Sequence, residues 1–202
     1  MAYSDVKTTF QAILNRRDIT STLVNTFMGF AIQRIHQEIR VPAMEKLVTL
    51  TTDGTSRLNV PGDLLEVISV HVNDASNGRT KLTRTDLPTI LTYAADQGQP
   101  IYYHREVGYL YLGPFPPDAQ SVFVHYFADS TSLTADTDVN WLTEVAPTLL
   151  IYAALTFAAD YYIDDRIKLF EDRYVQIRDG LNYMAQQDEV VNASIRPTFT
   201  VD

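Results

Sequence analysis

The strongest pattern in the chain lies between Leu149 and Met184, where the sequence runs LLIYAALTFAADYYIDDRIKLFEDRYVQIRDGLNYM. Its first part, Leu149–Ala159, is apolar nearly all round, which is typical of a helix buried among other helices. In its second part, apolar side chains recur at intervals of three and four residues: Ile167, Phe170, Tyr174, Ile177, Leu181 and Met184. This heptad seam, after a reversal over Asp160–Asp165, predicts an antiparallel helical hairpin. The first of its helices is expected to begin between Asn140 and Pro147, with Thr143 as its cap.

The N-terminal part of the chain predicts two more helices. The first begins at residue 4 or 5 and ends before residues 15–18. The second begins near Asp18 or Thr20 and ends at about Arg40, because the residue before Pro42 avoids the α region. Its apolar residues cover a wide arc, which predicts packing against several neighbours. Arg34 and Glu38 fall inside this arc, four residues apart, and are expected to pair.

The middle of the chain changes from helical to strand periodicity. A hairpin is predicted around Asp53-Gly54, and residues 66–73 alternate strictly, with Ile68, Val70 and Val72 on one face. A short helix is expected within residues 85–95. Further strands are predicted at Ile101–Arg105, Tyr109–Leu112 and Ser121–Phe127. About six short strands separated by turn signals predict a small antiparallel sandwich or barrel.

Together these patterns predict an α+β fold. A four-helix bundle, with helices at about 4–40 and 142–187, would carry an inserted antiparallel β-rich lobe at about 46–128. We expect residues 1–187 to form a single domain. Residues 188–202 have no apolar stripe and contain Pro197, so they are expected to be an extended C-terminal tail.

Composition excludes several classes of function. The chain has 202 residues, 46% of them hydrophobic and 20% charged, which suits a globular protein with a core. It has no cysteine, so disulfides, thiolate metal sites and a cysteine nucleophile are excluded. The net charge of −9 lies entirely in residues 102–202, and an acidic chain is a poor candidate for wrapping phosphate backbones. The N-terminal residues are those expected of a mature cytosolic protein, and no apolar stretch is long enough to span a bilayer.

The motifs of common enzymes are missing from the sequence. There is no G-x-S-x-G, S-x-x-K, P-loop, G-x-G-x-x-G or H-E-x-x-H. Three histidines, His71, His104 and His125, fall on predicted strands, but nothing in the pattern makes them converge on a metal. Residues 136–140 resemble the start of a calcium loop, yet the required glycine and glutamate are absent, so a helix-capping linker is expected instead. We therefore predict no catalytic residue, no metal ligand and no cofactor.

Several loose patterns follow one another in a distinctive order along the chain. The first is Leu14–Asp18, which comes before a long helix that ends in Ile35–Met44. It is followed by Leu58–Glu66, where proline and acidic residues lead into a strand, and then by Pro100–Tyr103, Leu110–Pro116 and Val122–Phe127. The last is Trp141–Leu142 with Ala146–Leu155, before the acidic final helix. This joint order, over roughly residues 10–185, resembles that of bacteriophage head-to-tail adaptor (connector) proteins. Such proteins form the ring beneath the portal.

The resemblance implies a virion structural protein and not an enzyme. It implies a homo-oligomer, a dodecameric ring on the portal protein in the virion neck, after assembly in the host cytoplasm. The ring would extend the DNA channel and present a surface to tail or nozzle proteins, while double-stranded DNA passes without specific binding. In relatives the C-terminal segment extends toward the portal, so the expected portal contacts here are Ile195, Arg196, Phe199 and Val201.

Two other hypotheses from the sequence stay open. One is a small soluble enzyme with a site between bundle and sheet, which requires a deep pocket with convergent polar residues and a perturbed carboxylate or histidine. The other is a monomeric protein-binding module, which ring assembly would argue against.

Overall fold

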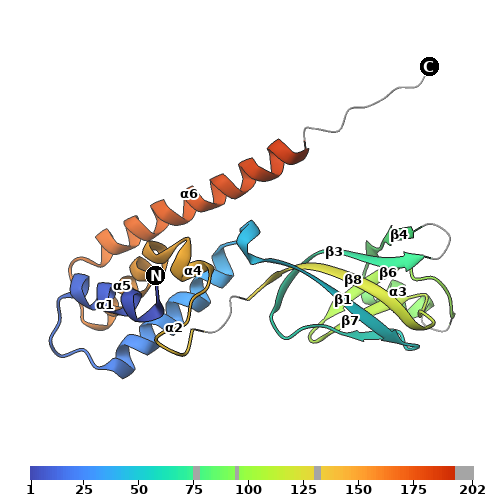
Figure 1. Ribbon diagram of the computed structural model, residues 1–202, viewed down its shortest axis with the longest axis horizontal. Helices are drawn as coiled ribbons and strands as arrows, with labels where there is room; N and C mark the ends of the chain where they lie inside the picture. The colour runs from blue at the N-terminus through green and yellow to red at the C-terminus, as the bar shows by residue number, and fades with distance from the viewer. Residues whose placement is uncertain (75–77, 94–95, 130–132, 194–202) are drawn as a thin grey trace, which may run out of the picture. The chain divides into compact units, whose positions relative to one another are not determined.

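The chain is an α+β protein that divides into two compact units (Figure 1). In a computed structural model, residues 1–74, 78–93, 96–129 and 133–193 are described. One unit comprises residues 1–44 together with the described residues after 129, and the other comprises residues 45–129. The helical unit is therefore built from both ends of the sequence, and the β-rich unit is inserted between its second and third helices.

The helical unit contains α1 (Tyr3–Leu14), α2 (Ser21–Glu38), α4 (Trp141–Glu144), α5 (Pro147–Tyr161) and α6 (Ile167–Ala193). Helix α5 packs against α1, α2 and α6, and Figure 1 shows it among them. Its buried side chains point in several directions around the helix axis: Leu149, Leu150, Ile151, Ala153, Ala154, Leu155, Ala158 and Ala159. The sequence-based prediction of an α5 buried on nearly all sides is confirmed, whereas the four-helix bundle stays a prediction.

The ends of these helices follow local capping rules. Thr20 caps α2, where its side chain accepts a hydrogen bond from the Leu23 N–H at 3.3 Å. The 3₁₀ helix η1 (Pro42–Met44) follows α2 and ends the helical run. The expected cap Thr143 is wrong, because Asn140 caps the short helix α4 and α5 begins separately at Pro147.

Helix α6 is longer and less covered than predicted. It continues to Ala193, whereas the sequence placed its end at Gln187. Residues 188–193 contain no glycine or proline that would end the helix at Gln187. Phe170 and Tyr174 are buried at 3% and 0% exposure, but Met184 is 63% exposed. Cover over the heptad seam therefore decreases toward its C-terminal end, where Ile177 and Leu181 are half-buried and Met184 is exposed.

The β-rich unit has two four-stranded sheets. The first has the order β1-β8-β3-β4, with β1 (Glu45–Asp53), β8 (Asp118–Ala128), β3 (Leu64–Asp74) and β4 (Gly78–Lys81). The second has the order β2-β7-β6-β5, with β2 (Arg57–Asn59), β7 (Tyr109–Gly113), β6 (Tyr102–Glu106) and β5 (Thr83–Arg84). All pairings are antiparallel except the two-residue contact of β5 with β6. Helix α3 (Leu87–Tyr93) lies between β5 and β6 in the sequence.

Both sheets contribute to one hydrophobic core. Val70, Val72, Val122 and Val124 of the first sheet join a single cluster with residues of the second, among them Leu58, Tyr103, Leu110 and Leu112. The sheets therefore pack as a sandwich, and the predicted alternative of a barrel is wrong since neither sheet closes.

Two predictions about the strands are also wrong. Asp53 and Gly54 do not form a hairpin turn, because β1 pairs with β8 and β2 pairs with β7. The turn instead carries the chain from one sheet to the other, with Gly54 at a φ of 76°. Ile68 does not share the buried face of Val70, because the register of β3 shifts between Val67 and Ser69. This β-bulge leaves Ile68 37% exposed.

The reversal between α5 and α6 contains a strained residue. Ile163 has a φ of 54° and is 91% exposed, so its branched side chain is strained without contributing to packing. We expect Ile163→Gly to raise the free energy of unfolding by about 1 kcal/mol.

Thermal and urea unfolding of the purified chain would measure this gain. The matched control is Val107→Gly, since Val107 is 94% exposed and its φ is not among the positive values. Val107→Gly is expected to lower the free energy of unfolding by about 0.5 kcal/mol, because glycine increases the conformational entropy of the unfolded chain. Equal effects of the two substitutions would contradict the assigned strain.

Candidate interaction surfaces

A polar network centred on Arg34 joins α2 to α6. The Arg34 guanidinium donates two parallel hydrogen bonds to Glu171 of α6, Nη1 to Oε2 at 2.8 Å and Nη2 to Oε1 at 2.6 Å. Its Nε donates to Glu38, one turn further along α2, at 2.8 Å. The guanidinium carbon also lies 4.1 Å from the centroid of the Tyr174 ring. The expected pair of Arg34 and Glu38 is confirmed, and Glu171 is a partner that sequence spacing could not show.

Glu38 receives hydrogen bonds from α6 in return. The Tyr174 hydroxyl and Arg178 Nη1 both donate to Glu38 Oε2, at 3.0 Å and 2.9 Å. Each helix thus contributes one arginine and one glutamate, so charges of opposite sign alternate across the α2–α6 contact. The network fixes the register of α6 on α2.

The network shifts the pKa values of its members. Burial alone would raise the pKa of Glu38, but hydrogen bonds from Arg34, Arg178 and Tyr174 outweigh it and lower that pKa. The hydrogen bonds from Arg34 lower the pKa of Glu171. Burial, and then the hydrogen bond to Glu38, raise the pKa of the Tyr174 hydroxyl. Both carboxyl groups are therefore held ionised near neutral pH.

Arg166 makes a second link, between the end of α1 and the start of α6. Its Nη2 donates to the Leu14 carbonyl at 2.9 Å, and its Nε and Nη2 donate to the Asp164 carboxylate at 3.0 and 2.7 Å. Hydrogen bonds from the Arg166 side chain and backbone lower the pKa of Asp164 to about 2. Asp164 therefore has the structural role at a helix start that the sequence indicated.

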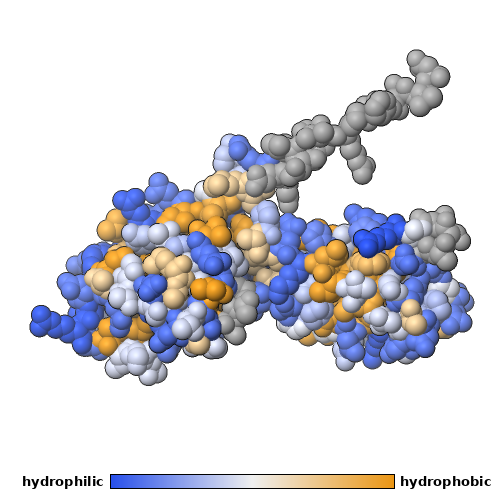
Figure 2. All heavy atoms as spheres, viewed as in Figure 1, coloured by the Kyte–Doolittle hydropathy of each residue, from blue (hydrophilic) through white to orange (hydrophobic). Residues whose placement is uncertain are grey.

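The C-terminal end of the α6 seam borders an apolar groove of about 180 Å³. Leu181, Met184 and Ala185 of α6 line it together with Val41–Ala43, Trp141 and Val145. The buried Trp141 Nε1 has no hydrogen-bond partner among the described residues. Figure 2 shows apolar surface on the helical unit around α6. This groove is a candidate docking surface.

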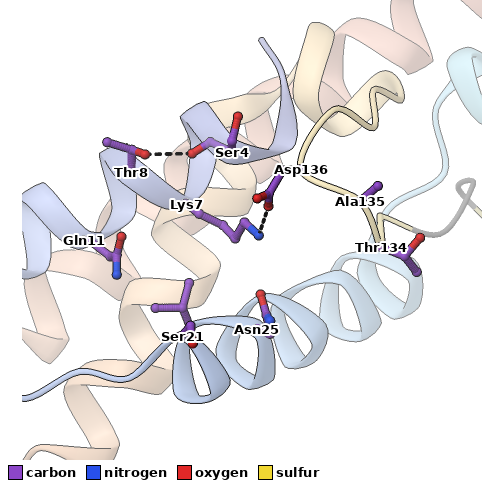
Figure 3. Close-up of a pocket in the computed structure, with 10 residues that line it drawn as sticks. Ser4, Lys7, Thr8, Gln11, Ser21, Asn25, Thr134, Ala135 and Asp136 are labelled. Atoms are coloured by element: carbon purple, nitrogen blue, oxygen red, sulfur yellow. Dashed lines mark hydrogen bonds and ion pairs between the residues drawn. The ribbon is translucent and has the colours of Figure 1, made fainter.

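A second hollow, of about 600 Å³, is open and polar (Figure 3). It lies between α1, α2 and residues 134–136, and in it the Lys7 ammonium pairs with the Asp136 carboxylate. The rest of its lining is mainly hydroxyl and amide groups from Ser4, Thr8, Gln11, Ser21 and Asn25. The ten described residues that line it include no histidine and no second carboxylate, so the lining offers hydrogen bonding rather than an acid–base pair.

The histidines predicted on strands are divided between the two sheets. His71 and His125 line a shallow pocket of about 420 Å³ on the first sheet, with Leu47, Phe123 and Arg79. His104 lies on β6 of the second sheet, where its Nδ1 is 3.0 Å from the Thr85 carbonyl oxygen. Burial, and then the positive charges of Lys81 and Arg79, lower the pKa of His71. His125 Nε2 lies 2.9 Å from Glu45 Oε2.

The predicted capping of the next helix by residues 136–140 is made by Asn140, whose side chain accepts a hydrogen bond from the Thr143 N–H of α4. The Asp138 carboxylate instead accepts the backbone N–H groups of Thr134 and Ala135, at 2.8 and 2.7 Å, in the loop before the helix. Among the side chains that the structure describes, no group of three or more His, Asp or Glu is placed to hold a metal ion. None of the helices within the described ranges is long and apolar enough to cross a membrane. The predicted portal contacts Ile195, Arg196, Phe199 and Val201 lie outside the described residues.

Comparison with known proteins identifies the family. A protein-family model described as "SU10 adaptor protein" matches residues 1–198, nearly the whole chain. No curated protein matches the sequence. The family resemblance inferred from the order of segments is confirmed.

Replacing Arg34 tests the α2–α6 network. Arg34→Met removes the charge and leaves Glu38 and Glu171 facing one another, with side chains that are 28% and 36% exposed. We expect a loss of about 2 kcal/mol in unfolding free energy, between the values for exposed and buried ion pairs. The matched control is Lys168→Met, because Lys168 pairs with Asp172 on the same helix while 83% exposed. Equal losses in urea unfolding for the two variants would contradict a structural role for the network.

The same network predicts a pH dependence. Folding lowers the pKa values of Glu38 and Glu171. Their contribution to the free energy of unfolding is therefore fully present above the pKa of the unfolded state, and it is lost as the pH falls through their pKa values in the folded state. The stability difference between wild type and Arg34→Met should therefore be largest near pH 7 and shrink below about pH 4. Urea unfolding at a series of pH values measures it. A difference that is independent of pH would show that lost packing, not charge, causes the effect.

Proposed function

Because the chain belongs to the SU10 adaptor protein family, a family of bacteriophage head-to-tail adaptors, we propose that it forms a ring beneath the portal. The ring would be a dodecamer in the virion neck, assembled in the host cytoplasm, and it would extend the DNA channel and carry the docking surface for tail proteins. The observation that carries the proposal is the family match over residues 1–198, which includes both the helical and the β-rich unit. Members of this family are structural phage proteins, and catalysis has no part in the proposal.

The helical unit and the C-terminal segment would bind the portal protein. The C-terminal end of the α6 seam, with the half-buried Leu181 and the exposed Met184, lies in the helix that precedes residues 194–202. In that segment Ile195, Phe199 and Val201 are apolar and Arg196 is positively charged. A docked portal segment would cover the apolar groove.

The charge of the chain suits a channel through which DNA slides. Residues 102–202 carry the whole net charge of −9. Carboxylates on α6 such as Asp172 and Asp179 are 64% and 60% exposed. A negative wall repels phosphates and does not grip them, so double-stranded DNA would pass without specific binding.

Stoichiometry is the first test of this function. We expect the purified chain, mixed with the portal protein of the same phage, to form a complex with one adaptor per portal subunit. Native mass spectrometry of the mixture, with the 22.8 kDa chain alone as reference, measures the ratio. A chain that stays at 22.8 kDa in every portal mixture would contradict the proposal and favour a monomeric module.

The C-terminal contact is tested by paired charge insertions. Ile195→Asp with Phe199→Asp would place carboxylates where apolar contacts are proposed, and we expect portal affinity to fall at least about ten-fold. The matched control is Thr198→Asp with Thr200→Asp, which adds the same charge at alternate positions of the same segment. Affinities are compared by surface plasmon resonance on immobilised portal. The same affinity for both variants would exclude these side chains as portal contacts.

A further inference from the structure

The outward face of the first sheet carries a compact group of cationic and apolar side chains. We call it the β4-end face and define it by Leu47, His71, Arg79, Lys81, Phe123 and His125. Five of these residues line the shallow pocket of about 420 Å³, and Lys81 lies beside it on β4. Leu47 is 61% exposed, and Arg79 and Lys81 are exposed as well.

Strand register brings these residues together. Lys81 on β4 is opposite His71 on β3, and His71 is opposite Phe123 on β8. In the next row Ser69 is opposite His125, which is opposite Leu47 on β1. Paired residues in a sheet point to the same face, so both rows form one continuous surface across the four strands. The opposite face of this sheet is the one buried in the sandwich core.

Positive charge is concentrated at this end although the unit is acidic. Residues 45–129 hold ten acidic and six basic residues. Arg79 and Lys81 lie at the β4 end, and the Arg79 guanidinium carbon is 3.9 Å from the Phe123 ring centroid. On the same face, Glu45 and Glu66 lie in the row through Phe127, about 13 Å along β8 from Phe123 at the usual rise per residue. The Glu45 side chain reaches back from this row, so that its Oε2 lies 2.9 Å from His125 Nε2. Arg79 and Lys81 therefore form the cationic end of the face, and its acidic end begins at the contact of Glu45 with His125.

From this arrangement we propose that the β4-end face binds an acidic peptide segment of the tail-side partner. Carboxylates of the peptide would pair with Arg79 and Lys81, and one of its apolar side chains would lie between Leu47 and Phe123. The inference rests on the proposed adaptor function and assigns the tail-docking surface within it. The occupant follows from charge complementarity, because a guanidinium already stacked on an aromatic ring is held in place to pair with a carboxylate. Two exposed cations in an acidic unit are too few to hold a phosphate backbone, so nucleic acid is not the occupant.

Charge reversal on the full chain in assembled heads tests the inference. The experiment uses tailless heads that carry the wild-type adaptor, the Arg79→Glu variant or the Lys81→Glu variant. These heads are mixed with tails purified from a phage mutant that makes no heads, and the infective particles that form are counted. We expect each reversal to lower tail joining at least about ten-fold at equal adaptor content per head. The matched control is Arg84→Glu, an exposed arginine on β5 of the other sheet, which should join tails like wild type.

A second variant separates binding from folding. Leu47→Asp adds a negative charge at a 61% exposed position and should also lower joining, while circular dichroism shows an unchanged melting curve. Wild-type levels of joining with Arg79→Glu would overturn the inference.

Adaptor content per head distinguishes the remaining outcomes. Heads that lose the adaptor only when Arg79 is reversed would mean that the β4-end face contacts a second copy of the chain, which also overturns the tail-side assignment. Heads that never acquire even the wild-type chain would instead remove the proposed function, and this inference with it.

Discussion

The bidentate contact between Arg34 and Glu171 holds together two parts of the chain that lie 137 residues apart. The β-rich unit is inserted between α2 and α5, so the helical unit closes only when segments from both ends of the sequence meet. Apolar packing of α2 and α6 against α5 provides the driving force but little directional control. The alternating charges of Arg34, Glu38, Glu171 and Arg178 provide that control, since a shift of α6 by one turn would leave like charges facing each other.

The contacts of α6 with α1 and α2 leave its C-terminal half free to bind other chains. Its first half is fixed by Tyr174, by the Arg34 network and by the Arg166 link to the end of α1. Its second half has the same heptad seam with less cover, since Leu181 is half-buried and Met184 is exposed, and it continues to Ala193. A rigid base that carries a partly exposed apolar groove is suited to assembly with other chains. The β-rich unit offers a separate surface of different chemistry, with cations and imidazoles on one sheet face. An adaptor needs two different surfaces because it joins two different partners.

The sequence was most informative where one periodicity controlled a whole element. Leu149–Ala159, apolar nearly all round, predicted the buried helix α5. The seam through Phe170 and Tyr174 predicted α6, because burial on one face of a helix repeats every turn. It was least informative where pairing is non-local. The Asp53-Gly54 turn has the residues of a hairpin, but the partners of β1 and β2 lie fifty or more residues away on β8 and β7. The bulge at Ile68 and the pairing of Arg34 with Glu171 equally depend on contacts that no local pattern encodes. The interaction surfaces shared this limit: each histidine was visible, whereas the meeting of His71 and His125 on one face needed the register.

A localised electron cryomicroscopy reconstruction of the neck of the intact virion would show whether this chain is the structural link between head and tail. We expect density for its helical and β-rich units in every subunit of a ring between the portal and the first tail protein. A neck whose density is fully explained by other proteins, with no copy of this chain, would contradict this role.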